Sequence, residues 1–366
     1  MEYKQLGNSG TIVSRFALGS MYFGGETSEQ DAFAIMDAYV EAGGNFIDTA
    51  NVYEEGKSEA IVGKWFISRP QEVTDRILIA SKGRHSTHGG PNAAGLSRPG
   101  LNRLLNESLT NLQRETIDLY QMHAWDPLTP PEETIRFLDD AVRAGKIHYV
   151  GLSNYTGWQL QLFMATAHQM NAVLPVTLQQ QYSLMSRESE WEVIPAALHN
   201  GVGLLPWSPL AGGFLAGKYQ RGTVPAKNTR AGSEKPLYQW ISAEYAESDR
   251  NWVIIDAVVQ IAKEIGATPS QVALSWLADR PSVTAPIFGA RTMEQLKDNL
   301  GAAKLHLSAD MTAKLDKVSK PQSGGYPYGA FGQGQRARSV DGSAEKKNPV
   351  SQGSDAPLGY ASPKQA

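Results

Sequence analysis

Cysteine is absent from the 366 residues of this sequence. The absence excludes disulfide bonds, thiolate metal ligands and a cysteine nucleophile, and it is typical of a reducing compartment such as the cytoplasm. Long apolar runs are absent too, since none approaches the roughly 18 residues that span a bilayer. The N-terminal residues MEYKQLGNSG also lack the basic and apolar regions of a signal peptide. We therefore expect a cytoplasmic protein with no membrane partner.

A strong excess of either charge is also lacking. The 34 basic and 37 acidic side chains are interspersed and give a formal net charge of -3, so no basic face predicts a nucleic-acid partner. The fingerprint GxGxxG does not follow the first apolar run, which disfavours a Rossmann dinucleotide fold. With 41% hydrophobic residues, a chain of this length can still bury a large core.

What the sequence does contain is a unit that recurs about eight times: a short apolar run, a polar turn and an amphipathic segment of helical length. Continuously apolar strands that alternate with helices indicate a parallel sheet covered on both faces. Such a series predicts an α/β fold of the (β/α)8 TIM-barrel type, with an open doubly wound sheet as the structural alternative. The apolar runs are FALG (16–19), NFID (45–48), ILIAS (77–81), IDLYQM (117–122), HYVGL (148–152), VTLQQ (176–180), VGLLP (202–206) and TAPIF (284–288).

Three segments fall outside this repeat. Residues 3–18 predict a β-hairpin around GNSG, which we interpret as a cap before the barrel. The long polar segment 210–248 follows the seventh predicted strand and indicates a functional loop or lid. Residues 323–366 are rich in Gly, Ser, Pro and Gln. We therefore expect a single barrel domain over 1–322 and a low-complexity, disordered C-terminal tail over 323–366.

Polar side chains follow the second, third and fourth predicted strands, at the end of a barrel where catalytic groups lie. Asp48 and Tyr53 come after the second strand, Lys82 after the third and His123 after the fourth. A nearby lysine cation lowers the pKa of a phenol, so we expect Tyr53 to act as a general acid nearer neutrality. Asp48 would hold Lys82, and His123 would orient a substrate oxygen. The set suits protonation of an oxygen that becomes negative during a reaction.

The later strand ends offer groups that suit a nicotinamide reductant. Ser153, Asn154 and Gln179 carry hydroxyl and amide groups able to bind a carboxamide. Trp207 offers a flat apolar face on which a planar ring can stack. Together with the proton-donating groups, these residues favour a reductase.

Residues for the phosphates of such a cofactor follow further along the chain. The segment SPLAGG (208–213) provides small residues where backbone amides can approach a pyrophosphate. Arg291 can pair with a phosphate through two N–H groups, and an arginine here favours the 2′-phosphate of NADP over NAD. We therefore expect NADP(H) as the cofactor.

Seven motifs together resemble the aldo-keto reductase family. They are NFIDTANVYEEGKSE, ILIASK, DLYQMH, VGLSNY, LQQQYSLMSR, PWSPLAGGFLAGKY and IFGARTMEQLKDNL, in family order within residues 3 to about 320. The GARxxxQLxxN form is similar to the long-chain bacterial branch and to potassium-channel beta subunits. The resemblance implies a reversible, NADPH-dependent reductase of aldehydes or ketones, in which hydride leaves nicotinamide C4 while Tyr53 donates the proton.

The same resemblance implies a set of site residues. The catalytic tetrad is then Asp48, Tyr53, Lys82 and His123. The chain departs from the family at Glu54, where relatives commonly carry Gly, and at Gly213, where many carry Arg. The implied cofactor residues are Gly19, Met21, Ser153, Asn154, Gln179, Trp207, Ser208, Leu210, Gly212, Lys218, Gly289, Ala290, Arg291, Gln295 and Asn299.

Other interpretations stay open. Lys82 alone would suit the Schiff-base lysine of an aldolase-like barrel, although Trp207 and Arg291 then have no role. Relatives of this branch serve as cofactor-loaded channel subunits, so a redox-sensing binding subunit with little turnover is the alternative to an enzyme. His85 and His88 lack a nearby carboxylate or third ligand, so we expect loop residues and no metal. The sequence identifies neither the carbonyl substrate nor whether the protein is a homo-oligomer.

Overall fold

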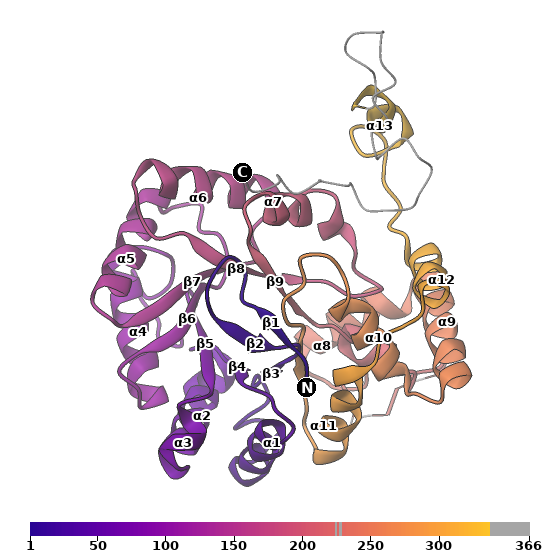
Figure 1. Cartoon of the computed structure of the whole chain (residues 1–366), viewed down its shortest axis with the longest axis horizontal. Helices are drawn as coiled ribbons and strands as arrows, with labels where there is room; N and C mark the ends of the chain where they lie inside the picture. The colour runs from indigo at the N-terminus through magenta and orange to yellow at the C-terminus, as the bar shows by residue number, and fades with distance from the viewer. Residues whose placement is uncertain (224, 227–228, 337–366) are drawn as a thin grey trace.

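Eight short apolar segments form a parallel sheet in the computed structural model, which describes residues 1–223, 225–226 and 229–336 (Figure 1). The strand order is β10-β3-β4-β5-β6-β7-β8-β9, so successive strands are neighbours and β10 returns to β3. This order confirms the predicted (β/α)8 barrel. The strands are β3 (Ala17–Gly19), β4 (Phe46–Asp48), β5 (Leu78–Gly83), β6 (Ile117–Met122), β7 (Ile147–Ser153), β8 (Pro175–Gln181), β9 (Gly203–Trp207) and β10 (Ile287–Gly289).

The sheet closes between β9 and β10 through irregular backbone. Leu204 in β9 donates its N–H to the Ser282 carbonyl at 2.8 Å and accepts from the Thr284 N–H at 2.9 Å. A Cβ on Gly203 would overlap the Thr284 hydroxyl and crowd the Gly7 backbone. This close approach therefore requires glycine, and it lets the loop before β10 seal the barrel.

Amphipathic helices cover the outside of the sheet, as Figure 1 shows. In α5 (Pro131–Arg143), Ile135 and Leu138 lie on the buried face. At the start of α10 (Pro269–Ala278), Thr268 and Gln271 form a capping box. None of the helices that the structure describes is long and apolar enough to cross a membrane. The other outer helices are α1 (Glu29–Glu41), α2 (Lys57–Ser68), α3 (Gln71–Thr74), α4 (Arg98–Leu112), α6 (Gly157–Gln169), α7 (Val193–His199), α9 (Asp249–Ile265), α11 (Met293–Leu300) and α12 (Ala309–Ser319).

The predicted N-terminal hairpin is present and fills one end of the barrel. Its strands β1 (Tyr3–Gln5) and β2 (Ile12–Ser14) pair antiparallel, and its turn brings Gly7 against the starts of β8 and β9. Leu6 and Val13 are buried with the side chains inside the barrel. The opposite end, where the strands finish, is therefore the one available for a site. The remaining buried residues of this inner core are Ala17, Phe46, Ala80, Leu119, Leu205, Ala285 and Ile287.

The predicted long segment after β9 contains helices of its own. The short helix η3 (Ala211–Ala216) follows β9 directly, and α8 (Pro236–Ala246) lies against it. Both precede α9 on the outer wall. The segment 210–248 is thus a partly helical excursion from the C-terminal end of the barrel.

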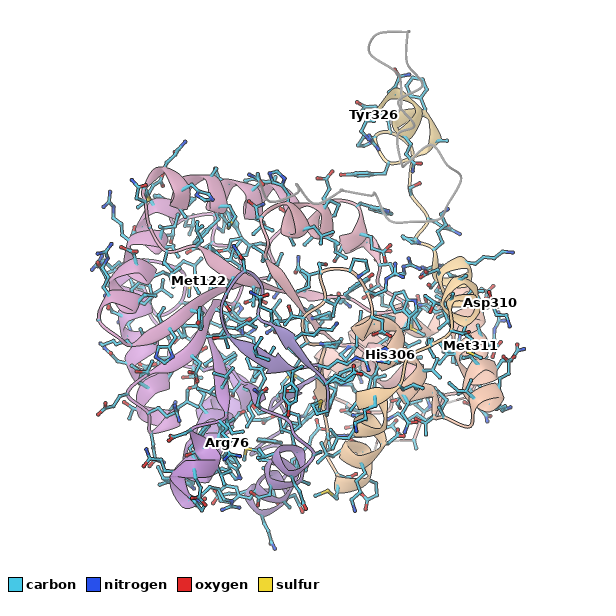
Figure 2. The ribbon with its side chains drawn as sticks, viewed as in Figure 1. Arg76, Met122, His306, Asp310, Met311 and Tyr326 are labelled. Atoms are coloured by element: carbon cyan, nitrogen blue, oxygen red, sulfur yellow. The ribbon has the colours of Figure 1, made fainter. Side chains whose placement is uncertain are left out.

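The last described helix, α13 (Ala330–Arg336), stands clear of the barrel (Figures 1 and 2). Tyr328, just before it, stacks on Trp191 with ring centroids 5.4 Å apart. These residues belong to the predicted tail 323–366, of which 337–366 lie outside the described residues. The division of the chain into a barrel and a disordered tail stays a prediction.

A polar network joins the hairpin to the C-terminal part of the barrel. Arg15 is fully buried, pairs with Asp279 at 2.7 Å and donates to the Leu305 carbonyl at 3.0 Å. Asp279 also lies 2.9 Å from His306, which Figure 2 labels; the other ring nitrogen of His306 is 3.0 Å from Glu2. Hydrogen bonds that His306 donates to Glu2 and then to Asp279 raise the pKa of its ring, because both carboxylates favour its charged form.

Replacing His306 by Gln will reduce stability more at low pH than at high pH. Because the pKa of His306 is raised in the folded protein, its contribution is fully present below the unfolded value of about 6.5 and is lost as pH rises through the folded value. The side chain is half exposed, so we expect a loss below about 1 kcal/mol.

Urea unfolding at about pH 6 and about pH 9 measures this difference. His168→Gln, an exposed substitution on α6, is the control. An effect of His306→Gln that is equal at both pH values would contradict the ion-pair assignment.

Candidate active site

Three neighbouring strands bring the predicted tetrad together at the C-terminal end of the barrel. Asp48 ends β4, Lys82 lies near the end of β5 and His123 follows β6. After β4 the chain turns into the short helix η1 (Tyr53–Gly56), which carries Tyr53 back to the strand ends. The Lys82 Nζ lies 2.6 Å from Asp48 Oδ1 and donates to Tyr53 Oη at 3.1 Å. Carboxylate, ammonium and phenol therefore form one hydrogen-bonded chain.

Burial controls the protonation of this chain. Desolvation alone would lower the pKa of the fully buried Lys82, but Asp48 and Tyr53 hold that pKa above its ordinary value, so Lys82 is a cation. For the phenol the balance is reversed: desolvation raises the pKa of Tyr53, and Lys82 offsets the rise only in part. The lowered pKa expected from the sequence is wrong for this protein, because that argument counted the cation and omitted the burial.

His123 is a neutral imidazole beside the chain. Desolvation, and after it the charge of Lys82, holds the pKa of His123 well below its usual value. Its ring lies edge-on to Tyr53 and to His85, with centroids 6.1 and 4.9 Å away, and its Nδ1 has no hydrogen-bond partner among the described residues. His85, interpreted from the sequence as a loop residue, thus lies against the site. In the described chain no group of His, Asp and Glu side chains is placed to hold a metal ion.

Two glutamine amides complete the surroundings of Asp48. Gln121 and Gln179 both donate to Asp48 Oδ2, at 3.0 and 2.9 Å, and Gln179 also donates to Gln121 Oε1 at 3.2 Å. Gln121 is fully buried and was missed in the sequence. Its signal was a polar residue inside an apolar strand, two positions before His123 and hence on the same face.

The tetrad opens into a cavity of about 590 Å³ at the mouth of the barrel. Three predicted residues do not line it: Lys82 lies behind Asp48 and Tyr53, and Ser153 and Ala290 are fully buried. All other predicted site residues line the cavity. They are Gly19, Met21, Asp48, Tyr53, His123, Asn154, Gln179, Trp207, Ser208, Leu210, Gly212, Lys218, Gly289, Arg291, Gln295 and Asn299.

The ends of β7 and β9 are linked by the side chain of Asn154. Its Nδ2 donates to the His123 carbonyl at 2.9 Å, and its Oδ1 accepts from Trp207 Nε1 at 3.1 Å. Asn154 and Ser208 both have positive φ, 56° and 52°, a conformation that non-glycine residues hold only where their surroundings impose it. The Trp207 indole is therefore fixed by its edge on the cavity wall.

The opposite part of the cavity, which we call the cationic end, is lined by Lys218, Arg230 and Arg291. Burial and the two nearby guanidinium groups lower the pKa of Lys218, a sign that these positive charges repel one another. Gly213, with φ of 95°, lies where a Cβ would contact the Lys218 side chain, so the missing side chain leaves room for the lysine.

Arg230 was missed in the sequence because it lies in the long segment after β9. Its guanidinium lies between the rings of Tyr22 and Tyr238, 5.3 and 4.6 Å from their centroids. Its buried Nε has no hydrogen-bond partner among the residues that the structure describes. Guanidinium and ammonium groups with hydrogen-bonding capacity to spare suit the phosphate groups of a nucleotide.

Sequence comparisons identify the class of protein that carries this site. The model of the Aldo/keto reductase family matches residues 15–320. The uncharacterized oxidoreductase YrpG of Bacillus subtilis (strain 168) is 38% identical over 335 residues, covering 89% of this chain and 98% of YrpG. The chain therefore belongs to the aldo/keto reductase family, as the seven motifs predicted.

Further relatives have names that indicate different roles. A probable voltage-gated potassium channel subunit beta of Oryza sativa subsp. japonica is 33% identical over 328 residues, covering 88% of this chain and 98% of the relative. Versiconal hemiacetal acetate reductase of Aspergillus parasiticus is 31% identical over 346 residues, with the same coverage of 88% and 98%. Family membership supports an oxidoreductase that acts on carbonyl groups.

Replacing Lys82 by Met will destabilise the protein strongly, because Asp48 then stays buried without its cation. Loss of one partner of a buried ion pair costs about 3–5 kcal/mol. The double variant Asp48→Asn/Lys82→Met removes both charges, so its loss will be smaller than the sum of the two single losses. Denaturant unfolding of the wild type and three variants measures this coupling. Additive losses would contradict a direct ion pair.

Proposed function

We propose that this protein reduces an aldehyde or ketone to the alcohol with NADPH and catalyses the reverse reaction when alcohol and NADP are in excess. The observation that supports this most is the chain Asp48–Lys82–Tyr53, which sets a phenol in the cavity wall with a buried cation behind it. A phenol in this position donates a proton to an oxygen that gains negative charge, and the cation stabilises the phenolate that remains.

The residues divide the work of carbonyl reduction. When NADPH is bound, it supplies a hydride from nicotinamide C4 to the carbonyl carbon. Tyr53 gives its proton to the carbonyl oxygen as the C=O double bond becomes a single bond, and Lys82 holds the resulting phenolate. The raised pKa of Tyr53 keeps the donor protonated before the reaction. Neutral His123 binds the same oxygen by a hydrogen bond, and solvent later returns the proton to Tyr53.

The cavity provides different groups for the two ends of the cofactor. Near the tetrad, Asn154 and Gln179 offer their amide oxygens to the nicotinamide carboxamide, because their amide nitrogens already donate within the protein. Ser153 lies behind them, and the fixed face of Trp207 supports the ring. The cationic end offers its guanidinium and ammonium groups to the phosphates. A cationic pocket of this kind supports NADP(H) as the cofactor.

A cofactor-holding subunit with little turnover is the second candidate. It is favoured by the relative named as a probable potassium channel subunit beta. An intact Asp48–Lys82–Tyr53 chain is compatible with both functions. Nucleotide that stays bound through purification, with no oxidation by any carbonyl compound, would favour this second function.

Replacing Tyr53 by Phe will remove turnover and preserve nucleotide binding. The phenol is the proton donor, and loss of a general acid lowers the rate by roughly 100-fold or more. The measurements are NADPH oxidation with aromatic aldehydes, cyclic ketones and sugar aldehydes, and NADPH fluorescence on binding.

The matched control is Tyr120→Phe. Tyr120 is a fully buried tyrosine outside the cavity, and its hydroxyl has no hydrogen-bond partner among the described residues. Removing the Tyr120 hydroxyl will leave the rate of NADPH oxidation nearly unchanged. A Tyr53→Phe variant that retains its rate or fails to bind NADPH would refute the role of Tyr53 as proton donor. A wild-type protein that oxidises NADPH with no compound of the panel would refute the proposed carbonyl reduction.

A further inference from the structure

One acidic residue is bound to the cationic end of the cavity. Glu26 lies between β3 and α1, lines the cavity and is about a fifth exposed, with a relative side-chain exposure of 22%. Its Oε2 accepts from Arg291 Nη1 at 2.9 Å, and its Oε1 accepts from Lys235 Nζ at 3.2 Å. The carboxylate thus joins the loop after β10 to the long segment after β9.

Glu26 carries a negative charge in this position. Burial would raise the pKa of its carboxyl group, but hydrogen bonds from Arg291 and Lys235 hold that pKa below the ordinary value. The ion pair with Arg291 is only partly exposed, so solvent screens it less than a surface pair. Part of the positive charge that a phosphate would meet here is therefore neutralised in advance.

Two other acidic residues near this end, Asp298 and Glu54, contact other groups. Asp298 lines the cavity, but its Oδ1 accepts from the Thr268 hydroxyl at 2.7 Å and from Gln271 Nε2 at 3.2 Å. Glu54 lies 3.9 Å from Lys235, and no contact joins it to Arg291 among those of the described residues. Glu26 is thus the carboxylate in direct competition for Arg291.

The competition distinguishes the two nicotinamide nucleotides. A 2′-phosphate that pairs with Arg291 must share the guanidinium with a carboxylate of the same sign, which opposes binding. A ribose 2′-hydroxyl meets no such repulsion, and a carboxylate accepts a hydrogen bond from it. The conflict therefore applies to NADPH and not to NADH.

We propose that Glu26 is a specificity-determining residue that restrains the preference for NADPH over NADH by competing with the 2′-phosphate for Arg291. The inference rests on the proposed function, because it takes Arg291 as the 2′-phosphate residue. It adds that the preference for NADPH over NADH is smaller than the three cavity cations alone would give.

Replacing Glu26 by Gln tests this directly, since the amide keeps the shape and one acceptor oxygen but loses the charge. Fluorescence or calorimetric titration of the purified protein gives the Kd of NADPH and of NADH. We expect Glu26→Gln to lower the Kd of NADPH about tenfold, the effect of removing one nearby like charge. The Kd of NADH will stay the same or rise. Adding Arg291→Met to Glu26→Gln will abolish the gain.

Two controls separate competition from other effects. Glu29→Gln removes the same charge three residues away, from an exposed pair with Lys64 at 2.7 Å, and will leave both Kd values unchanged. Lys235→Met removes the second cation that Glu26 binds and leaves the contact with Arg291, so the carboxylate will oppose the 2′-phosphate more; the Kd of NADPH will rise while that of NADH stays the same.

The outcomes distinguish this inference from the proposed function. An unchanged ratio of Kd values in Glu26→Gln would overturn the inference while the proposed function stands, and so would an equal change in Glu29→Gln. A wild type that binds neither nucleotide would overturn the proposed function, and the role of Glu26 with it.

Discussion

The buried ion pair between Lys82 and Asp48 is the interaction on which the rest of the site depends. An ammonium without water around it is tolerated only when a carboxylate and further hydrogen bonds surround it. Here Asp48 Oδ1 accepts a hydrogen bond from Lys82, and Oδ2 accepts hydrogen bonds from the side-chain amides of Gln121 and Gln179. These residues come from β4, β5, β6 and β8, so the pairing of the strands sets the chemistry. A shift of one residue in any of them would turn its side chain out of the barrel.

Much of the fold could be predicted because its pattern is local. Each strand is a short apolar run and each helix an amphipathic segment, so counting the units was enough to indicate a barrel. The grouping of Asp48, Lys82 and His123 could be predicted for the same reason, because they are the polar residues at which apolar runs end. The backbone bonds that close the sheet could not, because they join Leu204 to irregular backbone in the loop before β10.

The rest of the site depends on contacts between distant segments. Arg230 meets Tyr22 across most of the chain, and Glu26 meets Arg291 in the same way. No spacing in the sequence records such contacts. The protonation of Tyr53 was mispredicted for a related reason: a sequence shows which charges are near but not how much water is excluded. His85 likewise gave no signal of its packing against His123.

The N-terminal hairpin limits the ways in which a molecule can enter the barrel. Because its side chains fill one end, the strand ends that bear Asp48 and Gln179 form the floor of a cavity that opens on the loop side. Two molecules that bound in this cavity would both enter from the loop side. The molecule in contact with Asp48 and Gln179 would then bind first and leave last, and the shape of the cavity would set this order.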